Sequence, residues 1–131
     1  MQFKKNHVYH VYNRGNNKER IFFNLDNYEY FLKKIRKEWL THCDIIAYCL
    51  MPNHFHFMLM PNEEGCKYVT LGGRESHLQQ LSRSIGKTLS SYTRAINKNI
   101  GTTGNFFQQK TKSKNITDTD IDAPVYQLND Y

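Results

Sequence analysis

The sequence of 131 residues has few of the features that mark secreted, membrane and metal-thiolate proteins. It contains only three cysteines, Cys43, Cys49 and Cys66, and no Cys-x-x-Cys pair, which argues against a disulfide framework and a thiolate zinc site. No apolar run approaches the roughly 18–20 residues of a membrane span, and the polar N-terminus has no secretory hydrophobic region. These absences favour a cytoplasmic protein with no membrane partner.

Basic residues are missing from the end of the chain and concentrated before it. Residues 1–114 hold all 18 lysines and arginines and eight acidic residues, a net charge of +10. Residues 115–131 hold four aspartates and no basic residue, a net charge of −4. We therefore expect one domain over residues 1–114 and an acidic connector or tail over residues 115–131. The charge of the domain predicts a polyanionic partner, with nucleic acid ahead of an anionic membrane surface.

Hydrophobic periodicity predicts an α+β fold. We expect strands over residues 7–13, 43–51 and 54–60, a helix from Asp26 to about His42, a loop over residues 61–75, a long helix over residues 76–97 and a last strand within residues 105–116. The nearly continuous apolar run 43–51 predicts a central strand. The order β-α-β-β-α-β predicts the ferredoxin-like split β-α-β arrangement, an antiparallel sheet with two main helices packed on it.

Both predicted helices are amphipathic. Asp26 and Glu29 have the spacing of a capping box at the start of the first helix. The apolar face of this helix is expected to contain Leu25, Tyr28, Leu32, Ile35 and Trp39. That of the long helix is expected to contain Leu78, Leu81, Ile85, Leu89, Tyr92 and Ile96.

The segment His54-Phe55-His56 lies in a predicted strand that is otherwise apolar. Residues two apart in a strand share a face, about 6.6–7 Å apart, so the two imidazoles can converge on one divalent cation while Phe55 points the other way. Burying two polar rings needs a reason, and a divalent ion can polarise a phosphoryl oxygen. The alternatives are a histidine pair without a metal, or a small metal-dependent oxygenase, which needs about eight barrel strands instead of four candidates.

Residues 47–59, which include this motif, resemble the signature strand pair of the single-tyrosine HUH transposases, in particular the REP-associated tyrosine transposases and their relatives. Residues 9–17, 91–97 and 104–114 also match that family, in order and with plausible spacing. The resemblance implies a ferredoxin-like nuclease that acts on single-stranded or hairpin DNA in DNA transposition. It implies that His54 and His56 hold Mg²⁺ or Mn²⁺ on the scissile phosphate and that a tyrosine hydroxyl attacks it. Relatives include monomers and dimers, so a homodimer is compatible with it.

The family's nucleophile motif, roughly Tyr-Ile-x-x-Asn-Pro in a C-terminal helix, is absent from residues 1–131. Either the gene or the expressed segment is truncated before it, or another tyrosine substitutes. Tyr92 lies on an apolar helix stripe, where core packing is expected; Tyr126 lies in the Pro-led tail, and Tyr131 is the last residue. These are weak candidates, and we assign the nucleophile to none of them. A catalytically inactive DNA-binding remnant is therefore the alternative to an active transposase domain.

Several basic and amide side chains are candidates for DNA binding. They are Arg14, Asn16, Asn17, Lys87, Arg94, Lys110, Lys112 and Lys114. The last three lysines alternate, so a strand would turn them all toward one phosphate track. Phe106 and Phe107 are candidates for stacking on bases. Taken one at a time, each of these residues is better explained as a solvated charge or a core aromatic. Only the positive charge that the basic residues share favours DNA binding.

Overall fold

A computed structural model describes residues 1–117, which form an α+β fold. Four strands make an antiparallel sheet in the order β2-β3-β1-β6, and two more make a separate hairpin, β4-β5. The elements are β1 (Tyr9–Arg14), the 3-10 turn η1 (Asn16–Lys18), α1 (Leu25–Glu38), β2 (Cys43–Met51), β3 (His54–Pro61), α2 (Glu63–Cys66), β4 (Tyr68–Leu71), β5 (Arg74–Gln79), α3 (Gln80–Ile100) and β6 (Lys112–Asn115). Because β3 lies between β1 and β2, the predicted ferredoxin-like split β-α-β fold is confirmed.

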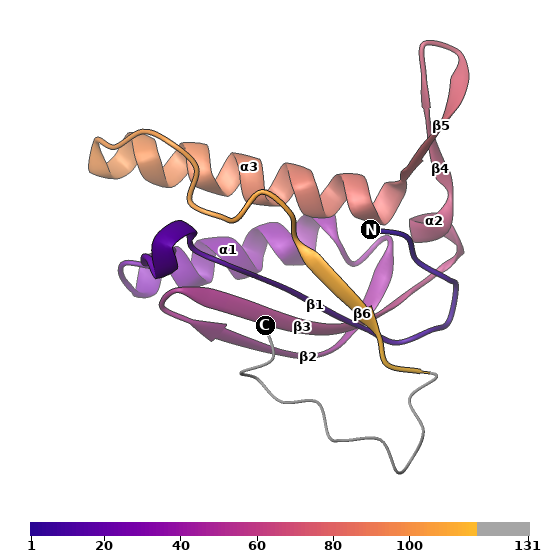
Figure 1. Ribbon diagram of the computed structural model, residues 1–131, viewed down its shortest axis with the longest axis horizontal. Helices are drawn as coiled ribbons and strands as arrows, with labels where there is room; N and C mark the ends of the chain where they lie inside the picture. Colours follow the sequence, from indigo (N-terminus) through magenta and orange to yellow (C-terminus); the bar gives the residue numbers. More distant parts are fainter. Residues whose placement is uncertain (118–131) are drawn as a thin grey trace.

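The hydrophobic core lies between the sheet and two helices, α1 and α3, which cover the same face of the sheet (Figure 1). Every second residue of β3 points into this core, so Phe55, Phe57 and Leu59 are fully buried. Trp39, just after α1, packs edge-on against Phe57, and its indole Nε1 donates to Thr88 Oγ1 of α3 at 3.0 Å. The two helices are therefore joined through the same aromatic layer that covers the sheet.

The prediction that residues 43–51 form a central strand is wrong in position, although the strand itself is confirmed. Among the described residues, β2 pairs only with β3 and lies at the edge of the sheet. More than half of the surface of Ile46 and Tyr48 is exposed. An apolar run indicates that a segment forms a strand. Which strands pair with it depends on the path that the rest of the chain takes. The two-residue turn after Met51 makes β3 the neighbour of β2, and β3 then pairs with β1 on its other side.

Helix α1 begins one residue before the expected start and uses another cap. The N-cap is Asn24, whose side-chain oxygen accepts from the backbone N–H of Asn27 at 3.0 Å. The Asn27 side chain in turn accepts from the N–H of Phe23 at 2.8 Å. Asp26 already lies inside the first turn, so the predicted capping box of Asp26 and Glu29 does not form. The helix ends at Glu38, earlier than His42.

The buried face of α1 is rotated from the predicted one. Phe31, Ile35 and Trp39 are buried at a spacing of four residues, whereas Leu25 is 70% exposed. Leu25 is the first residue of the helix, directly after the N-cap. On α3, the buried residues include all the predicted ones except Leu78, which belongs to β5 and is exposed.

The segment predicted as a loop, residues 61–75, contains a short helix and most of a hairpin. Gly72 and Gly73 both have positive φ, 57° and 79°, which is the geometry of a two-residue turn between antiparallel strands. Strand β5 then takes up the expected start of the long helix, so α3 begins at Gln80. The hairpin projects from the body beyond the start of α3 (Figure 1). The helix ends at Gly101, whose φ of 71° is a left-handed C-cap.

The first and last strands of the sheet are shorter than predicted. The strand predicted over residues 7–13 spans Tyr9–Arg14, and that predicted within residues 105–116 spans only Lys112–Asn115. Pairing with the first strand continues just past this last strand, because the N–H of Ile116 donates to the carbonyl of Val8 at 2.9 Å. Within residues 1–117, no helix is long and apolar enough to cross a membrane.

The rotated face of α1 gives a test of the fold. We expect Phe31→Ala to lower the free energy of unfolding by about 3–5 kcal/mol, because it leaves a cavity in the aromatic core. Leu25→Ala on the same helix is the control, and its effect should stay within about 0.5 kcal/mol because the side chain is exposed. Urea unfolding followed by circular dichroism measures both. Equal destabilisation of the two variants would contradict the buried face described here.

Candidate functional site on the histidine face of the sheet

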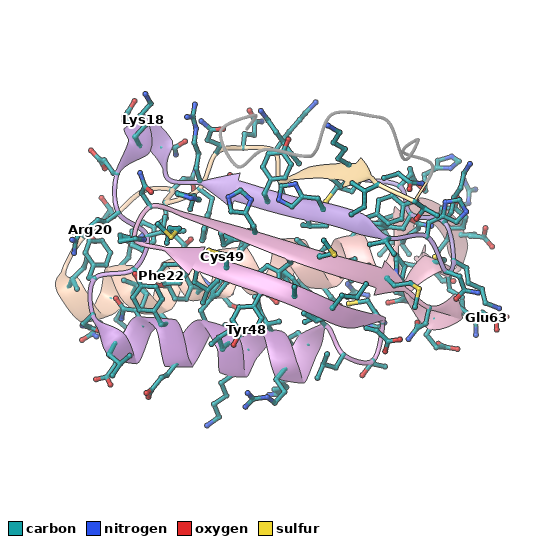
Figure 2. All side chains as sticks on the ribbon, turned by 90° about the horizontal axis from the view of Figure 1, so that it is seen from below. Lys18, Arg20, Phe22, Tyr48, Cys49 and Glu63 are labelled. Atoms are coloured by element: carbon teal, nitrogen blue, oxygen red, sulfur yellow. The ribbon has the colours of Figure 1, made fainter. Side chains whose placement is uncertain are left out.

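The alternation of β3 places its histidines opposite its core residues. While Phe55 and Phe57 face the helices, His54 and His56 lie on the other face, with ring centroids 5.1 Å apart. The predicted placement of both imidazoles on one face of a strand is therefore confirmed. We call the sheet face turned away from α1 and α3 the histidine face. Figure 2 looks onto this face, with Cys49 of β2 labelled on it.

Strand register brings further side chains to the histidine face. In β1, Arg14 is the partner of His54 and Tyr12 the partner of His56. In β6, Lys112 is the partner of Tyr12 and Lys114 the partner of His10, and in β2 Cys49 is the partner of His56. Directly paired residues of antiparallel strands point to the same side of a sheet. The face therefore combines His10, Tyr12, Arg14, His54, His56, Cys49, Lys112 and Lys114.

The ring of His54 is oriented by the residue before it. His54 Nδ1 lies 2.7 Å from Asn53 Oδ1, and the Asn53 amide nitrogen donates to the carbonyl of Lys18 at 3.3 Å. Since the amide oxygen can only accept, His54 Nδ1 carries the proton and Nε2 is the lone-pair nitrogen. Burial also lowers the pKa of His54, which favours the neutral ring.

His56 contacts a histidine that the sequence did not single out. Its Nδ1 lies 2.7 Å from Nε2 of His10, and both side chains are buried. Burial, with a smaller contribution from His54, lowers the pKa of His56 to about 4. Burial, with His56 and Lys114 nearby, lowers the pKa of His10 to about 4 as well. Both rings are therefore neutral at pH 7, which is the form of histidine that binds metal ions.

The turn that carries these histidines is held by the segment after β1. The carbonyl of Asn53 accepts from the N–H of Gly15 at 2.9 Å, and the carbonyl of Pro52 accepts from the N–H groups of Ile21 and Phe22 at 2.8 and 3.1 Å. Gly15 is required there, because a Cβ atom would stand 2.0 Å from the carbonyl oxygen of Glu19. The segment of residues 14–17 thus supports the histidines rather than projecting freely from the sheet.

Some of the predicted DNA-binding residues on this side already have hydrogen-bond partners within the chain. When the Gln108 side-chain amide is oriented with its oxygen toward Arg14, that oxygen accepts a hydrogen bond from Arg14 Nε at 2.8 Å. Asn16 donates to the carbonyl of Asn105 at 3.2 Å, whereas Asn17 is exposed with a φ of 56°. The prediction that Lys110, Lys112 and Lys114 share one strand face is wrong for Lys110. It precedes β6 in a bend, so strand alternation fixes only the other two.

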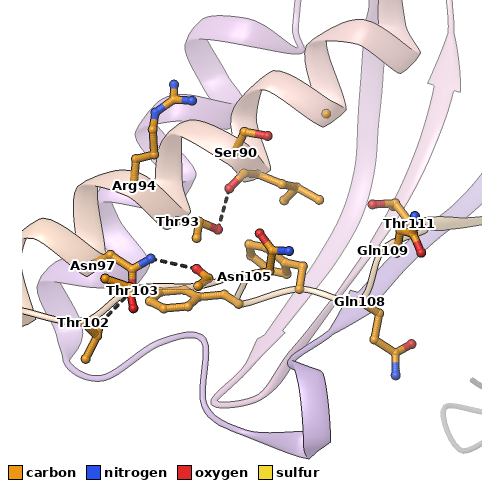
Figure 3. A pocket seen from close by; sticks show the side chains of 15 residues that line it. Ser90, Thr93, Arg94, Asn97, Thr102, Thr103, Asn105, Gln108, Gln109 and Thr111 are labelled. Atoms are coloured by element: carbon orange, nitrogen blue, oxygen red, sulfur yellow. Dashed lines mark hydrogen bonds between the residues drawn. The ribbon is translucent and has the colours of Figure 1, made fainter.

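Lys87 and Arg94 lie on α3, in the layer opposite the histidine face. Beside the second half of this helix, a polar groove of about 730 Å³ separates α3 from residues 102–111 (Figure 3). Asn97 closes one end by donating to the carbonyl of Gly104 at 2.8 Å. Phe107 is a buried core residue, and Phe106 lies against the Tyr92 ring. For Phe107 the core-aromatic alternative to base stacking is therefore confirmed.

The described tyrosines include one of the weak nucleophile candidates. Tyr92 is fully buried, as its place on the apolar stripe predicted, and its hydroxyl donates to the carbonyl of Ile21 at 2.6 Å. Burial, with Tyr28 and Tyr30 nearby, raises the pKa of Tyr92 above its ordinary value. Tyr126 and Tyr131 lie outside the described residues, as do all four aspartates of the predicted acidic tail.

Sequence reasoning missed three members of the histidine face, His10, Tyr12 and Cys49. His10 and Tyr12 lie in the predicted strand 7–13, and their spacing is that of His54 and His56. That alternation was the available signal, but only the pairing of β1 with β3 shows that the two sets share a face. Within residues 1–117, no three His, Cys, Asp or Glu side chains are grouped so as to hold a metal ion.

Comparison with known proteins supports the fold. No protein-family model matches the sequence. No curated protein matches it either. Among solved structures, the chain is similar to the REP-associated tyrosine transposase bound to a REP hairpin, with a TM-score of 0.59 and 17% sequence identity. The similarity covers 91% of this chain and 61% of that chain, so this chain spans about three fifths of its length. At this identity the likeness shows a shared fold.

Proposed function

We propose that this chain is the metal-binding and DNA-binding part of a single-tyrosine HUH transposase. Its substrate would be single-stranded or hairpin DNA, cleaved and transferred with the help of a divalent metal ion. The observation that carries the proposal is the pair His54 and His56, side by side on the central strand β3 of a split β-α-β sheet. The structural neighbour, which is bound to a REP hairpin, supports the same substrate class.

The proposed ion is Mn²⁺ or Mg²⁺, and the donor set bears on the choice between them. Imidazole is a good ligand for transition metals, whereas Mg²⁺ prefers oxygen, so two histidines favour Mn²⁺. His54 offers Nε2 because Asn53 occupies its Nδ1, and both rings are neutral at pH 7. Two nitrogen ligands leave positions for water and phosphate oxygens. When bound, such an ion would polarise the scissile phosphate and offset the charge that develops on it.

The cationic residues of the histidine face would hold the DNA backbone next to that phosphate. Lys112 lies opposite Tyr12, which lies opposite His56, so two strand spacings, about 10 Å, separate the Lys112 and His56 backbones. One segment of single-stranded DNA is long enough to contact both Lys112 and His56. Lys112 and Lys114 alternate along β6 and point to the same side. We therefore propose that the phosphate track runs across β6, β1 and β3, with Arg14 at the end near His54.

A non-catalytic DNA-binding module is the second candidate function. The observation that favours it is the burial of Tyr92, which removes the described candidate nucleophile from any contact with substrate. Such a protein would keep its affinity for hairpin DNA and lose strand cleavage. The two functions differ in one measurable property, the formation of a covalent link between a tyrosine and DNA.

The metal site is tested by Mn²⁺ titration. We expect weak binding that broadens the backbone amide NMR signals of the strand residues around positions 54 and 56, because two imidazoles with water make a loose site. The double variant His54→Ala with His56→Ala should lose this response. His77→Ala, an exposed histidine of β5, is the control and should retain it. An unchanged Mn²⁺ response in the double variant would remove the two histidines as ligands.

The phosphate track is tested by the salt dependence of hairpin DNA binding. Lys112→Ala with Lys114→Ala should flatten the slope of log K against log[salt] by about 1.5, because each neutralised phosphate contributes roughly 0.7–0.9 to it. Lys33→Ala with Lys37→Ala removes the same charge from exposed positions on α1 and should leave the slope unchanged. If Lys87→Ala with Arg94→Ala changes the slope and the β6 pair does not, the DNA lies along the helix layer instead.

Covalent chemistry is tested on a denaturing gel with end-labelled single-stranded DNA and Mn²⁺. We expect no phosphotyrosine adduct from residues 1–131, because Tyr92 is enclosed in the core and loss of a positioned nucleophile costs several orders of magnitude in rate. A covalent band would contradict this expectation and favour the active enzyme. Substitution of Tyr126, Tyr92 and Tyr131 by Phe, one at a time, would then identify the residue, with Tyr126 tested first.

A further inference from the structure

We propose that His10 is a positioning residue for the candidate metal site. It accepts a hydrogen bond from His56 Nδ1 and so keeps the lone pair of His56 on Nε2. This inference rests on the proposed function, because it assigns His10 a task at the same pair of histidines. His10 itself would bind neither the metal nor the DNA.

The contact between the two rings allows only two arrangements of the shared proton. His10 Nε2 and His56 Nδ1 are 2.7 Å apart, and the ring planes differ by 10°, so one neutral ring donates and the other accepts. If His56 donates, its Nε2 holds a lone pair that can bind a metal. If His10 donates, the proton of His56 lies on Nε2, and that nitrogen cannot be a ligand.

The arrangement at His54 favours the first of these. There the amide oxygen of Asn53 takes the Nδ1–H, so His54 presents Nε2 as its lone-pair nitrogen. His56 Nδ1 is occupied by the contact with His10, so His56 can bind an ion only through Nε2, which must then hold the lone pair. Histidine ligands of metals usually donate their second ring N–H to an acceptor, which fixes both the tautomer and the ring orientation. Asn53 supplies that acceptor for His54, and His10 is placed to supply it for His56.

His10 is itself held firmly enough to do this. Its side chain is 7% exposed, and its ring stacks on Tyr12 with centroids 4.3 Å apart and planes within 15°. Tyr12 is the register partner of His56, so β1 carries both the acceptor and the ring that supports it. The acceptor comes from a strand far from the His54–His56 motif in sequence. Its position therefore depends on the pairing of β1 with β3 rather than on the local geometry of β3.

The first experiment needs neither a variant nor a metal. In ¹⁵N-labelled protein without metal at neutral pH, long-range ¹H–¹⁵N correlation of the imidazoles reports which ring nitrogen carries the proton. We expect His54 and His56 both to be Nδ1–H tautomers. A His56 signal of the Nε2–H form would overturn the proposal, whatever the protein does with metal ions.

Two variants of His10 then separate the effect of its hydrogen-bond acceptor from the effect of its ring packing. His10→Phe keeps an aromatic ring against Tyr12 without an acceptor, and should release the His56 tautomer and weaken Mn²⁺ binding by about 10–100-fold. His10→Gln offers an amide oxygen in place of Nε2 and should keep the Nδ1–H form, with an affinity within about threefold of wild type. His77→Phe, on exposed β5, controls for loss of a histidine elsewhere and should change neither readout.

The outcomes distinguish failure of this inference from failure of the proposed function. If His10→Phe leaves the tautomer and the Mn²⁺ affinity as in wild type, His10 is not a positioning residue. Equal weakening in folded His10→Gln and His10→Phe would show that the acceptor is not what matters, and would also overturn it. If the double variant His54→Ala with His56→Ala binds Mn²⁺ as well as wild type, the metal site itself is wrong. The proposed role of His10 is then wrong as well, even if NMR shows the expected tautomer of His56.

Discussion

The backbone pairing of β3 with both of its neighbours is the constraint on which the rest of the structure depends. It fixes which face of the sheet each side chain of β3 takes, with Phe55 and Phe57 in the core and His54 and His56 opposite. A slip of one residue would exchange the two sets, exposing two phenylalanines and burying two histidines against the helices. The hydrophobic core therefore sets the position of the candidate site, because the same alternation serves both faces.

The two sides of the sheet are also coupled through the turn before β3. The carbonyls of Pro52 and Asn53 accept hydrogen bonds from Ile21, Phe22 and Gly15, and two of these residues, Ile21 and Phe22, are buried in the aromatic core. The side chain of Asn53 orients His54. Phe22 in the core is thus connected through one peptide hydrogen bond to the residue before Asn53, whose side chain orients a proposed metal ligand.

The sequence predicted those features that depend on local periodicity. The strand 54–60, the two-residue turn before it, the two main helices and the shared face of His54 and His56 follow from spacing along the chain, and the structure confirms them. The edge position of β2 and the approach of His10 to His56 depend on which strands pair, and nothing local encodes that. The β4-β5 hairpin was missed for another reason. Its strands are short and its Gly72-Gly73 turn is equally typical of a loop.

The distribution of positive charge bears on the size of the ligand. Lys112 and Lys114 lie on the histidine face, whereas Lys87 and Arg94 lie on α3, with the aromatic core between the two layers. A single strand that follows the sheet cannot contact both sets. The segment 102–111 links the two layers at the side of the molecule and borders the polar groove along α3. A nucleic acid that used all of these cations would have to pass around that segment, and so would have to be longer than one that contacts the sheet alone.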